Sequence, residues 1–259
     1  MKTALITGGS SGIGFALAGE FGRRGYRVAL LARRADVLES NAALLAAQGY
    51  TALAVPCDVT DAGAVRSACD GVLRQWGSID VAIANAGVGI PTPARKFVLA
   101  DAAQVMTTNF YGMLYLYDAV IPGMLEQRSG TFAGIASLAG LRGLPGSSAY
   151  SASKAAMQAF LESVRVELAP HGVSVTIVNP GFVATPMTEK NRFRMPFLMT
   201  TEKAAGIIAR GLDRHARQIE FPMPMSILMR AARLMPAFAY DGVFRLYGKR
   251  RIDARQVRR

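Results

Sequence analysis

Cysteine and histidine are scarce in this sequence, with two of each among 259 residues. Cys57 and Cys69 lie twelve residues apart, a spacing that fits neither a zinc site nor a disulfide framework. We therefore expect two reduced thiols in a cytoplasmic protein, and no bound metal. His171 and His215 are expected to lie at the surface.

Long hydrophobic runs are also missing. The apolar run in the opening residues, MKTALITGG, is too short for a signal peptide or a membrane span, so we interpret it as a first strand. The sequence shows no repeat of solenoid length and no low-complexity linker. With 51% apolar and 19% charged residues, it suits one globular domain over residues 1–259.

Acidic residues are outnumbered: 18 Asp and Glu stand against 30 Lys and Arg, giving a net charge of +12. Residues 223–259 hold nine Lys or Arg and two Asp, so this segment alone carries +7. The excess is therefore concentrated near the C-terminus and is not spread over a domain-wide face. We expect no nucleic-acid partner.

Short apolar runs alternate with helical patterns along the chain. The expected strands are 3–7, 28–32, 51–59, 80–87, 130–137, 173–181 and 218–221, and the expected helices are 12–24, 34–48, 61–76, 101–127, 150–169 and 201–215. Strands rich in Val, Ile, Leu and Ala, separated by helices, are typical of a parallel sheet covered on both faces. Right-handed crossovers then predict a three-layer, doubly wound α/β fold of about seven strands, which binds ligands at the carboxyl ends of the strands.

A glycine-rich turn, TGGSSGIG, follows the first expected strand. Glycine lets the backbone turn tightly and approach a phosphate, and the start of the next helix offers free N–H groups. A glycine-rich turn can be a tight turn that binds no ligand. Its place between a first strand and a helix, however, predicts dinucleotide binding. The expected contacts from this turn are Gly8, Ser10, Ser11, Gly12, Ile13 and Gly14.

Two arginines, Arg33 and Arg34, follow the second strand, where a site for NAD usually carries an acidic residue. A guanidinium suits a 2′-phosphate through paired, charge-assisted hydrogen bonds. We therefore expect NADP(H) to be preferred over NAD(H). The alternative is an exposed basic helix start with no such role.

Polar residues also end the third and fourth strands. Asp58, followed by Val59, is placed to accept a hydrogen bond from the adenine amino group, and Asn85-Ala86-Gly87 is placed beside the adenine ribose. Asp58 could instead cap the helix that begins near Asp61, and Asn85 could brace the sheet.

Tyr150 and Lys154 lie four residues apart in the stretch SAYSASKAA and therefore share one face of a helix. A nearby ammonium favours the phenolate form of tyrosine, so the pair predicts a proton donor and acceptor usable near neutral pH. Small neighbours are expected to leave room for cofactor and substrate; these are Ser148, Ala149, Ser151, Ala152 and Ser153.

Two further polar residues support this pair. Ser137 ends the fifth strand, where its hydroxyl could hydrogen-bond the carbonyl oxygen that Tyr150 protonates. Asn109, in the 101–127 helix, could hold a water next to Lys154, or it could be a helix-kinking residue without a catalytic part.

Over about residues 1–220 the chain resembles the short-chain dehydrogenase/reductases. The resemblance is carried by TGGSSGIG, Asp58, Asn85-Ala86-Gly87, Asn109, Ser137, Tyr150-x-x-x-Lys154 and Pro180-Gly181, in the family's order and spacing. It implies a Rossmann fold, a nicotinamide cofactor and the tetrad Asn109, Ser137, Tyr150 and Lys154. It also implies that Tyr150 and Lys154 contact the cofactor, Lys154 at the nicotinamide ribose, and that Val183 and Thr185, after Pro180-Gly181, contact the carboxamide.

The expected reaction is reversible hydride transfer between NADPH and a ketone or aldehyde, with Tyr150 as general acid in reduction. An NAD-dependent alcohol dehydrogenase of the same family is the alternative enzyme. A dinucleotide-sensing binding protein is the alternative without catalysis, and the complete tetrad argues against it.

The resemblance makes residues 185–201 a lid over the substrate. Its large apolar residues are Met187, Phe193, Met195, Phe197, Leu198 and Met199. Flexible Met and flat Phe side chains suit a long or irregular apolar substrate of the 3-ketoacyl, keto-lipid or steroid type. The alternative is ordinary packing of two short helices.

Residues 223–259 form a C-terminal extension that mixes apolar and basic residues, and Pro236 and Gly242 are expected to divide it into short helices. It could lie as a peripheral contact on an anionic membrane surface, cover the pocket or a neighbouring subunit, or end in a basic tail.

Helices 101–127 and 150–169 carry small and apolar residues around more of their circumference than one core face needs. In the family that the chain resembles, these helices commonly pair between subunits. We therefore expect a homodimer or homotetramer.

Overall fold

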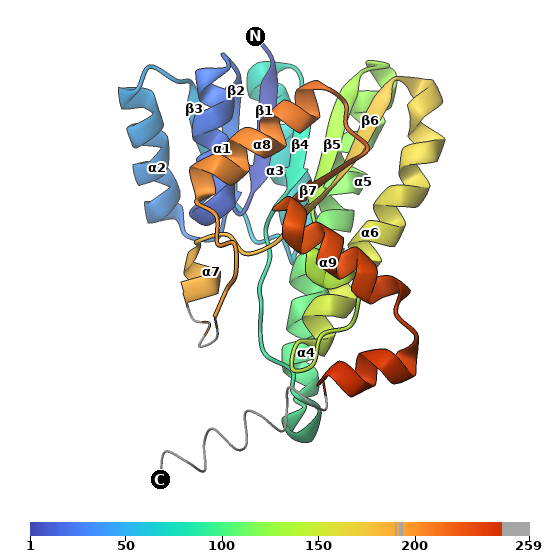
Figure 1. The fold of residues 1–259 in the computed structure, drawn as a ribbon. Coiled ribbons are helices and arrows are strands. Elements are labelled where there is room, and N and C mark those ends of the chain that lie inside the picture. Colours follow the sequence, from blue (N-terminus) through green and yellow to red (C-terminus); the bar gives the residue numbers. More distant parts are fainter. Residues whose placement is uncertain (190, 192–193, 245–259) are drawn as a thin grey trace.

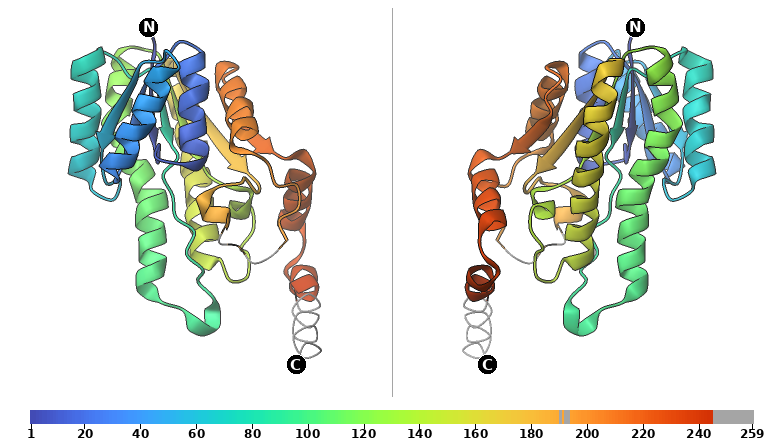
Figure 2. Two further views of the ribbon diagram at one scale, coloured as in Figure 1. Left: turned by 90° about the vertical axis from the view of Figure 1, so that its left-hand side faces the viewer. Right: turned by 90° about the vertical axis from the view of Figure 1, so that its right-hand side faces the viewer.

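The computed structural model describes residues 1–189, 191 and 194–244. Within that part of the chain, a seven-stranded sheet lies between two layers of helices (Figures 1 and 2). The strands are β1 Thr3–Thr7, β2 Arg27–Ala32, β3 Ala52–Pro56, β4 Val81–Ala84, β5 Gly130–Ile135, β6 Val173–Pro180 and β7 Gln218–Phe221. Their order is β3-β2-β1-β4-β5-β6-β7, and each neighbouring pair is parallel. The predicted doubly wound, three-layer fold is confirmed.

Helices cover both faces of the sheet (Figure 2). The α-helices are α1 Gly12–Arg23, α2 Ala35–Ala47, α3 Ala62–Trp76, α4 Leu99–Met106, α5 Gly112–Glu126, α6 Ser148–Leu168, α7 Pro186–Glu189, α8 Thr201–Asp213 and α9 Met223–Leu234. Short helical turns join them at η1 Ala94–Lys96, η2 Thr107–Tyr111, η3 Leu138–Gly140 and η4 Ala169–His171. One core contains side chains of α3, α5 and α6, and the other contains side chains of α1, α2 and α8.

The first strand shows why these sequences form a buried sheet. All five of its residues are buried, and successive side chains point to opposite faces. Leu5 therefore packs in the core with α3, α5 and α6, whereas Ala4 and Ile6 pack in the core with α1, α2 and α8. Each large apolar side chain buried in this way contributes about 1.5–3 kcal/mol to folding.

The chain changes direction between β1 and β4. From β1 it runs outward to β2 and β3, then returns to place β4 on the other side of β1. In doubly wound sheets such a reversal leaves a crevice at the carboxyl ends of the strands. That edge faces downward in Figure 1, toward α7 and α9.

Several elements differ from the predicted bounds. Three strands end early, at Pro56, Ala84 and Ile135, because the residues that follow leave the sheet for the crevice. The expected helix 101–127 is α4 and α5 joined by the π-helical turn η2. Such a turn accommodates an extra residue within a helix.

The C-terminal extension also differs from the expected division. Helix α9 ends at Leu234, just before Pro236, as predicted. Gly242, however, does not break a helix, since it lies inside a helical stretch over residues 237–244. Residues 245–259 of the expected extension lie outside the described residues.

Candidate active site

A cleft of about 580 Å³ opens at the carboxyl edge of the sheet. It is lined by most of the residues singled out in the sequence: Gly8, Ser10, Ser11, Gly12, Ile13, Arg33, Arg34, Asp58, Val59, Asn85, Ala86, Gly87, Ser137, Tyr150, Lys154, Pro180, Gly181, Val183 and Thr185. These residues come from six strand ends and from α6, so the fold brings together groups far apart in sequence. Gly14 and Asn109 do not line the cleft.

The glycine-rich turn has the backbone shape that a phosphate cradle needs. Gly8 and Gly12 have φ angles of 68° and 59°, a region that L side chains rarely adopt. A Cβ atom on Gly12 would lie 3.1 Å from the side chain of Thr185. Ser11, the N-cap of α1, makes no side-chain capping bond, so the first-turn N–H groups of α1 are left for an anion. The turn therefore fits a dinucleotide pyrophosphate.

Gly14 and Asn85 hold this turn in place. A Cβ atom on Gly14 would lie 2.3 Å from the carbonyl oxygen of Gly8, so only glycine lets α1 approach so closely. The Asn85 side-chain amide donates to the carbonyls of Thr7 at 2.9 Å and Gly8 at 3.3 Å. Asn85 thus braces the sheet edge while also lining the cleft.

Arg33 and Arg34 are both exposed at the end of β2. The Arg34 guanidinium donates a 3.2 Å hydrogen bond to the hydroxyl of Ser10, which places a cation beside the glycine-rich turn. This donor set is suited to a second phosphate near the first.

The capping alternative for Asp58 is wrong. Asp61 is the N-cap of α3, and its carboxylate accepts from the N–H of Ala64 at 3.0 Å. The Asp58 carboxylate accepts from the N–H and hydroxyl of Thr60 at 3.0 and 2.9 Å. The bond from the Thr60 N–H, helped by Arg33, holds the pKa of Asp58 below its usual value. Asp58 is therefore a fixed anionic acceptor on the cleft wall.

Tyr150 and Lys154 face each other across one turn of α6. The Lys154 Nζ lies 5.8 Å from the centroid of the Tyr150 ring and donates to the carbonyl of Ile135 at 2.7 Å. Lys154 is only 4% exposed, and this burial lowers the pKa of its ammonium to about 7.

The expected lowering of the Tyr150 pKa by Lys154 is not found. Burial raises the pKa of the phenol, and the nearby Ser137 hydroxyl only partly opposes this rise. The reason is that burial takes both side chains out of water, and this desolvation penalises the charged form of each. In the protein alone, Tyr150 is therefore a protonated donor at neutral pH.

Ser137 stands between β5 and η3. Its hydroxyl accepts from the N–H of Ala139 at 3.1 Å and donates weakly to the carbonyl of Pro180 at 3.4 Å. The weak second bond leaves the hydroxyl proton able to turn toward a carbonyl oxygen in the cleft.

Asn109 sits in the π-helical turn η2 and is 1% exposed. Its side chain bonds both backbone groups of Val88, at 2.7 and 3.1 Å, and donates to the hydroxyl of Ser153 at 3.0 Å. A Cβ atom on Gly87 would lie within 3.6 Å of both Asn109 and the Nζ of Lys154. Asn109 thus fixes the segment after β4 directly beside Lys154.

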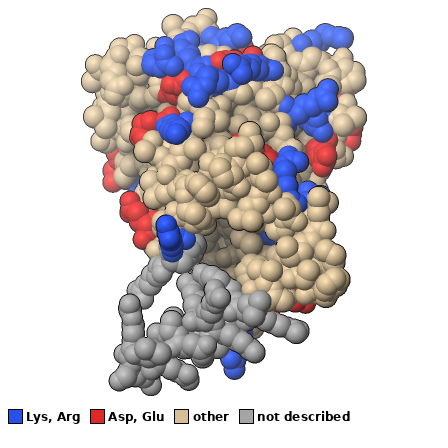
Figure 3. All heavy atoms as spheres, viewed as in Figure 1, with Lys and Arg blue, Asp and Glu red and all other residues tan. Residues whose placement is uncertain are grey.

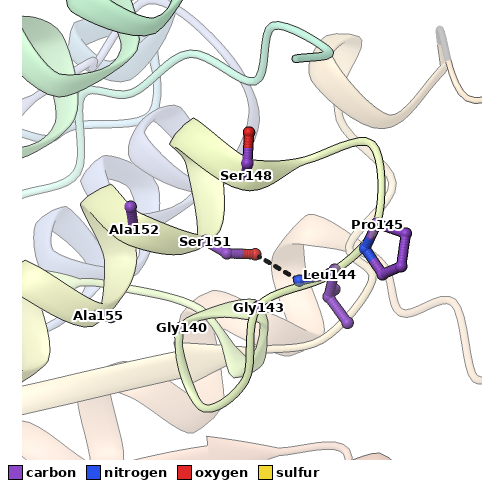
Figure 4. A pocket seen from close by; sticks show the side chains of 8 residues that line it. All are labelled: Gly140, Gly143, Leu144, Pro145, Ser148, Ser151, Ala152 and Ala155. Carbon is purple, nitrogen blue, oxygen red and sulfur yellow. Dashed lines mark hydrogen bonds between the residues drawn. The ribbon is translucent and has the colours of Figure 1, made fainter. Parts of the chain in front are cut away.

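The small neighbours of Tyr150 do not line the cleft, contrary to expectation. Ser148, Ser151 and Ala152 line a separate cavity of about 450 Å³ between α6 and the loop 140–145 (Figure 4). There the Ser151 hydroxyl accepts from the N–H of Leu144 at 3.2 Å. The difference follows from helical geometry, because residues one or two positions from Tyr150 point away from its face.

Gln158 is a partly buried polar group that the sequence reasoning missed. It lies one more turn along the face of α6 that carries Tyr150 and Lys154, and its amide donates to the carbonyl of Ser137 at 2.8 Å. The signal was present as a polar residue four positions after Lys154. Thr7 was missed too: its hydroxyl accepts from the N–H groups of Asn85 and Ala86.

The wall of the cleft near Tyr150 is apolar. It includes Val88, Ile90 and Met187, the last from the expected lid. Backbone bonds of 2.8 and 3.0 Å join Met199 to Ala184 and Phe182, so both ends of the segment are held together. Phe197 and Leu198 are exposed, and Phe193 lies outside the described residues.

The two cysteines, of which Cys57 lines the cleft, and the two histidines take no part in the groups described above. Cys57 and Cys69 are free and buried, and burial raises the pKa of their thiols to about 11 and about 12. His171 and His215 are exposed, as expected. Across the described residues no three His, Cys, Asp or Glu side chains form a metal-binding group, and no helix there has the length and hydropathy to span a membrane.

Comparison with known proteins finds a matching family model and similar sequences. Residues 2–195 match the family model described as short chain dehydrogenase. An uncharacterized oxidoreductase of Myxococcus xanthus is 39% identical over 244 residues, which cover 94% of this chain and 96% of that protein. The 11-beta-hydroxysteroid dehydrogenase-like 3 protein of Arabidopsis thaliana is 35% identical, covering 95% of this chain and 81% of that protein.

A solved structure is also similar. It is a variant of the actinorhodin polyketide ketoreductase with NADPH, with a TM-score of 0.81 and 26% sequence identity. The match covers 87% of this chain and 97% of the other.

Proposed function

Because the chain belongs to the short-chain dehydrogenases, a family of oxidoreductases that use a nicotinamide cofactor, we propose that it is an NADP(H)-dependent carbonyl reductase. It reversibly interconverts a ketone and a secondary alcohol on an apolar, lipid-like substrate. The observation that carries the proposal is the placement of Ser137, Tyr150 and Lys154 on one wall of the cleft that the glycine-rich turn also lines.

The cofactor would lie along the cleft from Arg34 to Tyr150. The first turn of α1 would hold its pyrophosphate, Arg33 and Arg34 its 2′-phosphate, and Asp58 and Asn85 its adenosine. Pro180, Gly181, Val183 and Thr185 would line the nicotinamide end. When bound, NADPH supplies the hydride for the carbonyl carbon.

Each polar side chain then has one task. The Tyr150 phenol, protonated at neutral pH, donates its proton to the carbonyl oxygen. The Ser137 hydroxyl donates a hydrogen bond to the same oxygen and stabilises its developing charge. Lys154 bonds the cofactor ribose, and the anionic cofactor favours its ammonium form.

Asn109 supports a proton path. Because its amide fixes the segment after β4 beside Lys154, it would hold a water there and link Lys154 to solvent. This relay resupplies the proton that Tyr150 gives away.

The apolar substrate class rests on the lining near Tyr150. Val88, Ile90 and Met187 offer no charge to a substrate. The polyketide and steroid names of similar proteins agree with this class. Residues 185–201 would act as the lid.

Subunits would pair through α5 and α6. Ala152, Ala155, Ala159 and Val166 are exposed on α6, and Tyr111 is exposed at the start of α5. Pairing these helices in a homodimer or homotetramer would cover this surface.

A screen of NADPH oxidation over 3-ketoacyl thioesters, keto-sterols and long-chain ketones tests the function. With an active substrate, Tyr150→Phe should lower kcat by about 10²–10⁴-fold and change NADPH affinity far less, because the ring stays and only the hydroxyl is removed. Tyr26→Phe is the matched control, since Tyr26 packs on Phe21 away from the cleft. Near-normal reduction by Tyr150→Phe would refute the mechanism.

A further inference from the structure

Large apolar side chains are exposed mainly at one end of the molecule. Of the exposed large apolar residues, those at this end are Phe97, Val98, Leu99, Met187, Phe197, Leu198, Met223, Ile227, Leu228, Leu234, Phe238 and Val243. They come from the start of α4, the expected lid and the segment 223–244, which lie on the side of the carboxyl edge of the sheet, below the strands in Figure 1. Only four others are exposed on the described chain: Met1, Leu44, Tyr111 and Val166. We call the first set the apolar rim.

Helix α9 carries apolar residues both on its packed face and on an exposed face that belongs to the apolar rim. Its inner face packs Met225 and Met229 against Leu138 and Leu141. Its outer face presents Met223, Ile227, Leu228 and Leu234, the last with 85% of its surface exposed. A helix that is apolar on two opposite faces is typical of one covered on both sides.

The rim adjoins the apolar end of the cleft at Met187. Met187 belongs to both, and Val88 and Ile90 of the cleft wall precede Phe97 along the same connecting segment. In Figure 3 the middle of this face is largely uncharged, whereas Lys and Arg gather over its upper part. The cover that the rim requires would therefore lie over the cleft entrance.

Basic residues flank the rim. Arg95 and Lys96 immediately precede Phe97, Arg194 lies exposed within the expected lid, and Arg233 lies exposed at the end of α9. By sequence, residues 245–259, which follow Val243 closely, contain seven Lys or Arg and one Asp. A second copy of the chain would bring like charges together at this face, whereas anionic headgroups would neutralise them.

We propose that the apolar rim docks on the surface of an anionic lipid bilayer. The apolar residues enter the boundary between headgroups and acyl chains, and Arg95, Lys96, Arg194 and Arg233 contact the headgroups. The docking proposal rests only on the exposed residues described above and does not depend on the proposed function. Its consequence, that the cleft receives its apolar substrate from the bilayer, rests on the proposed function.

Vesicle flotation of the full-length protein tests the proposal. Vesicles of phosphatidylcholine and phosphatidylglycerol in equal parts should carry the protein upward, vesicles of phosphatidylcholine alone should carry much less, and added NaCl should weaken the binding. Combining Leu234→Asp with Phe238→Asp should weaken binding to the anionic vesicles by about tenfold or more, since both residues are over four-fifths exposed.

Leu44→Asp is the matched control, because Leu44 is exposed on α2, away from the rim. It should bind vesicles as the wild type does. Both variants are checked by thermal unfolding and NADPH binding, which report folding and the cleft independently of lipid. The proposal is overturned if wild-type protein does not float with anionic vesicles, or if the rim variant floats equally well. A rim variant that instead halves the mass in light scattering would assign the rim to a second copy.

Discussion

The side-chain amide of Gln158 donates to the backbone carbonyl of Ser137 at 2.8 Å and to the side chain of Asn179 at 2.9 Å. Asn179, fully buried, donates in turn to Glu220 at 3.3 Å, and Glu220 is paired with Arg230 of α9 at 2.8 Å. An unbroken chain of hydrogen bonds therefore connects the surface helix α9 to the backbone of Ser137.

Gln158→Leu should lower kcat more than it changes KM, because Gln158 positions Ser137 without touching the substrate. It should also cost about 1–3 kcal/mol of stability, since the Asn179 oxygen would lose its partner. Steady-state kinetics and urea unfolding measure the two effects. Gln48→Leu, on the exposed end of α2, serves as control. A Gln158→Leu variant that is less stable but has unchanged kcat would show a structural role only.

Replacing both Arg33 and Arg34 by Ala should weaken NADPH binding by about 10–100-fold, the cost of about 1.5–3 kcal/mol for lost charge-assisted bonds. NADH binding should change little, because NADH has no 2′-phosphate. Fluorescence titration with both cofactors gives the ratio, and Arg74→Ala on α3 is the control. If the wild type binds NADH as tightly as NADPH, the chain is the NAD-dependent alternative.

The buried Lys154 predicts a pH dependence of stability. Its pKa is about 7 in the folded protein against an ordinary 10.5, so between these values the unfolded chain binds a proton that the folded protein lacks. Stability from this group therefore rises with pH, by up to about 1.4 kcal/mol per pH unit. Lys154→Met should remove that rise. Urea unfolding of both proteins without cofactor from neutral to mildly alkaline pH measures the difference, and equal slopes would contradict the assignment.

Ala152→Arg should separate subunits if α6 lies between them. Ala152 is exposed beside the cavity in Figure 4, and a long cation there would prevent close helix packing. Light scattering should show a lower mass than that of the wild type, while Ala46→Arg on α2 should leave the mass unchanged. A wild type that is already monomeric would remove the proposed pairing.

The order and type of the elements could be predicted because the local signals agreed. β1, for example, is buried at every position, and its sequence TALIT contains no charge. The ends of the strands held the polar residues that line the cleft, so the site followed from topology once the strands were known. The spacing of Tyr150 and Lys154 then fixed a shared helical face.

Properties that depend on three-dimensional packing could not be predicted. The pKa of Tyr150 is set by how much water reaches it, which no spacing reveals. Asp58 and Asp61 are both good N-cap residues three positions apart, and the sequence does not rank them. Gly242 lies within a helix because a single glycine costs only about 1 kcal/mol there.

The backbone bonds that join Met199 to Phe182 and Ala184 have a consequence for how this scaffold can diversify. Because these bonds hold both ends of the stretch in place, substitutions between them that spare Thr185 and Thr188, whose side chains reach Gly12 and the carbonyl of Val183, leave the sheet undisturbed. Substitutions in this one segment can thus change which ligand binds, while the positions of Ser137, Tyr150 and Lys154 stay the same.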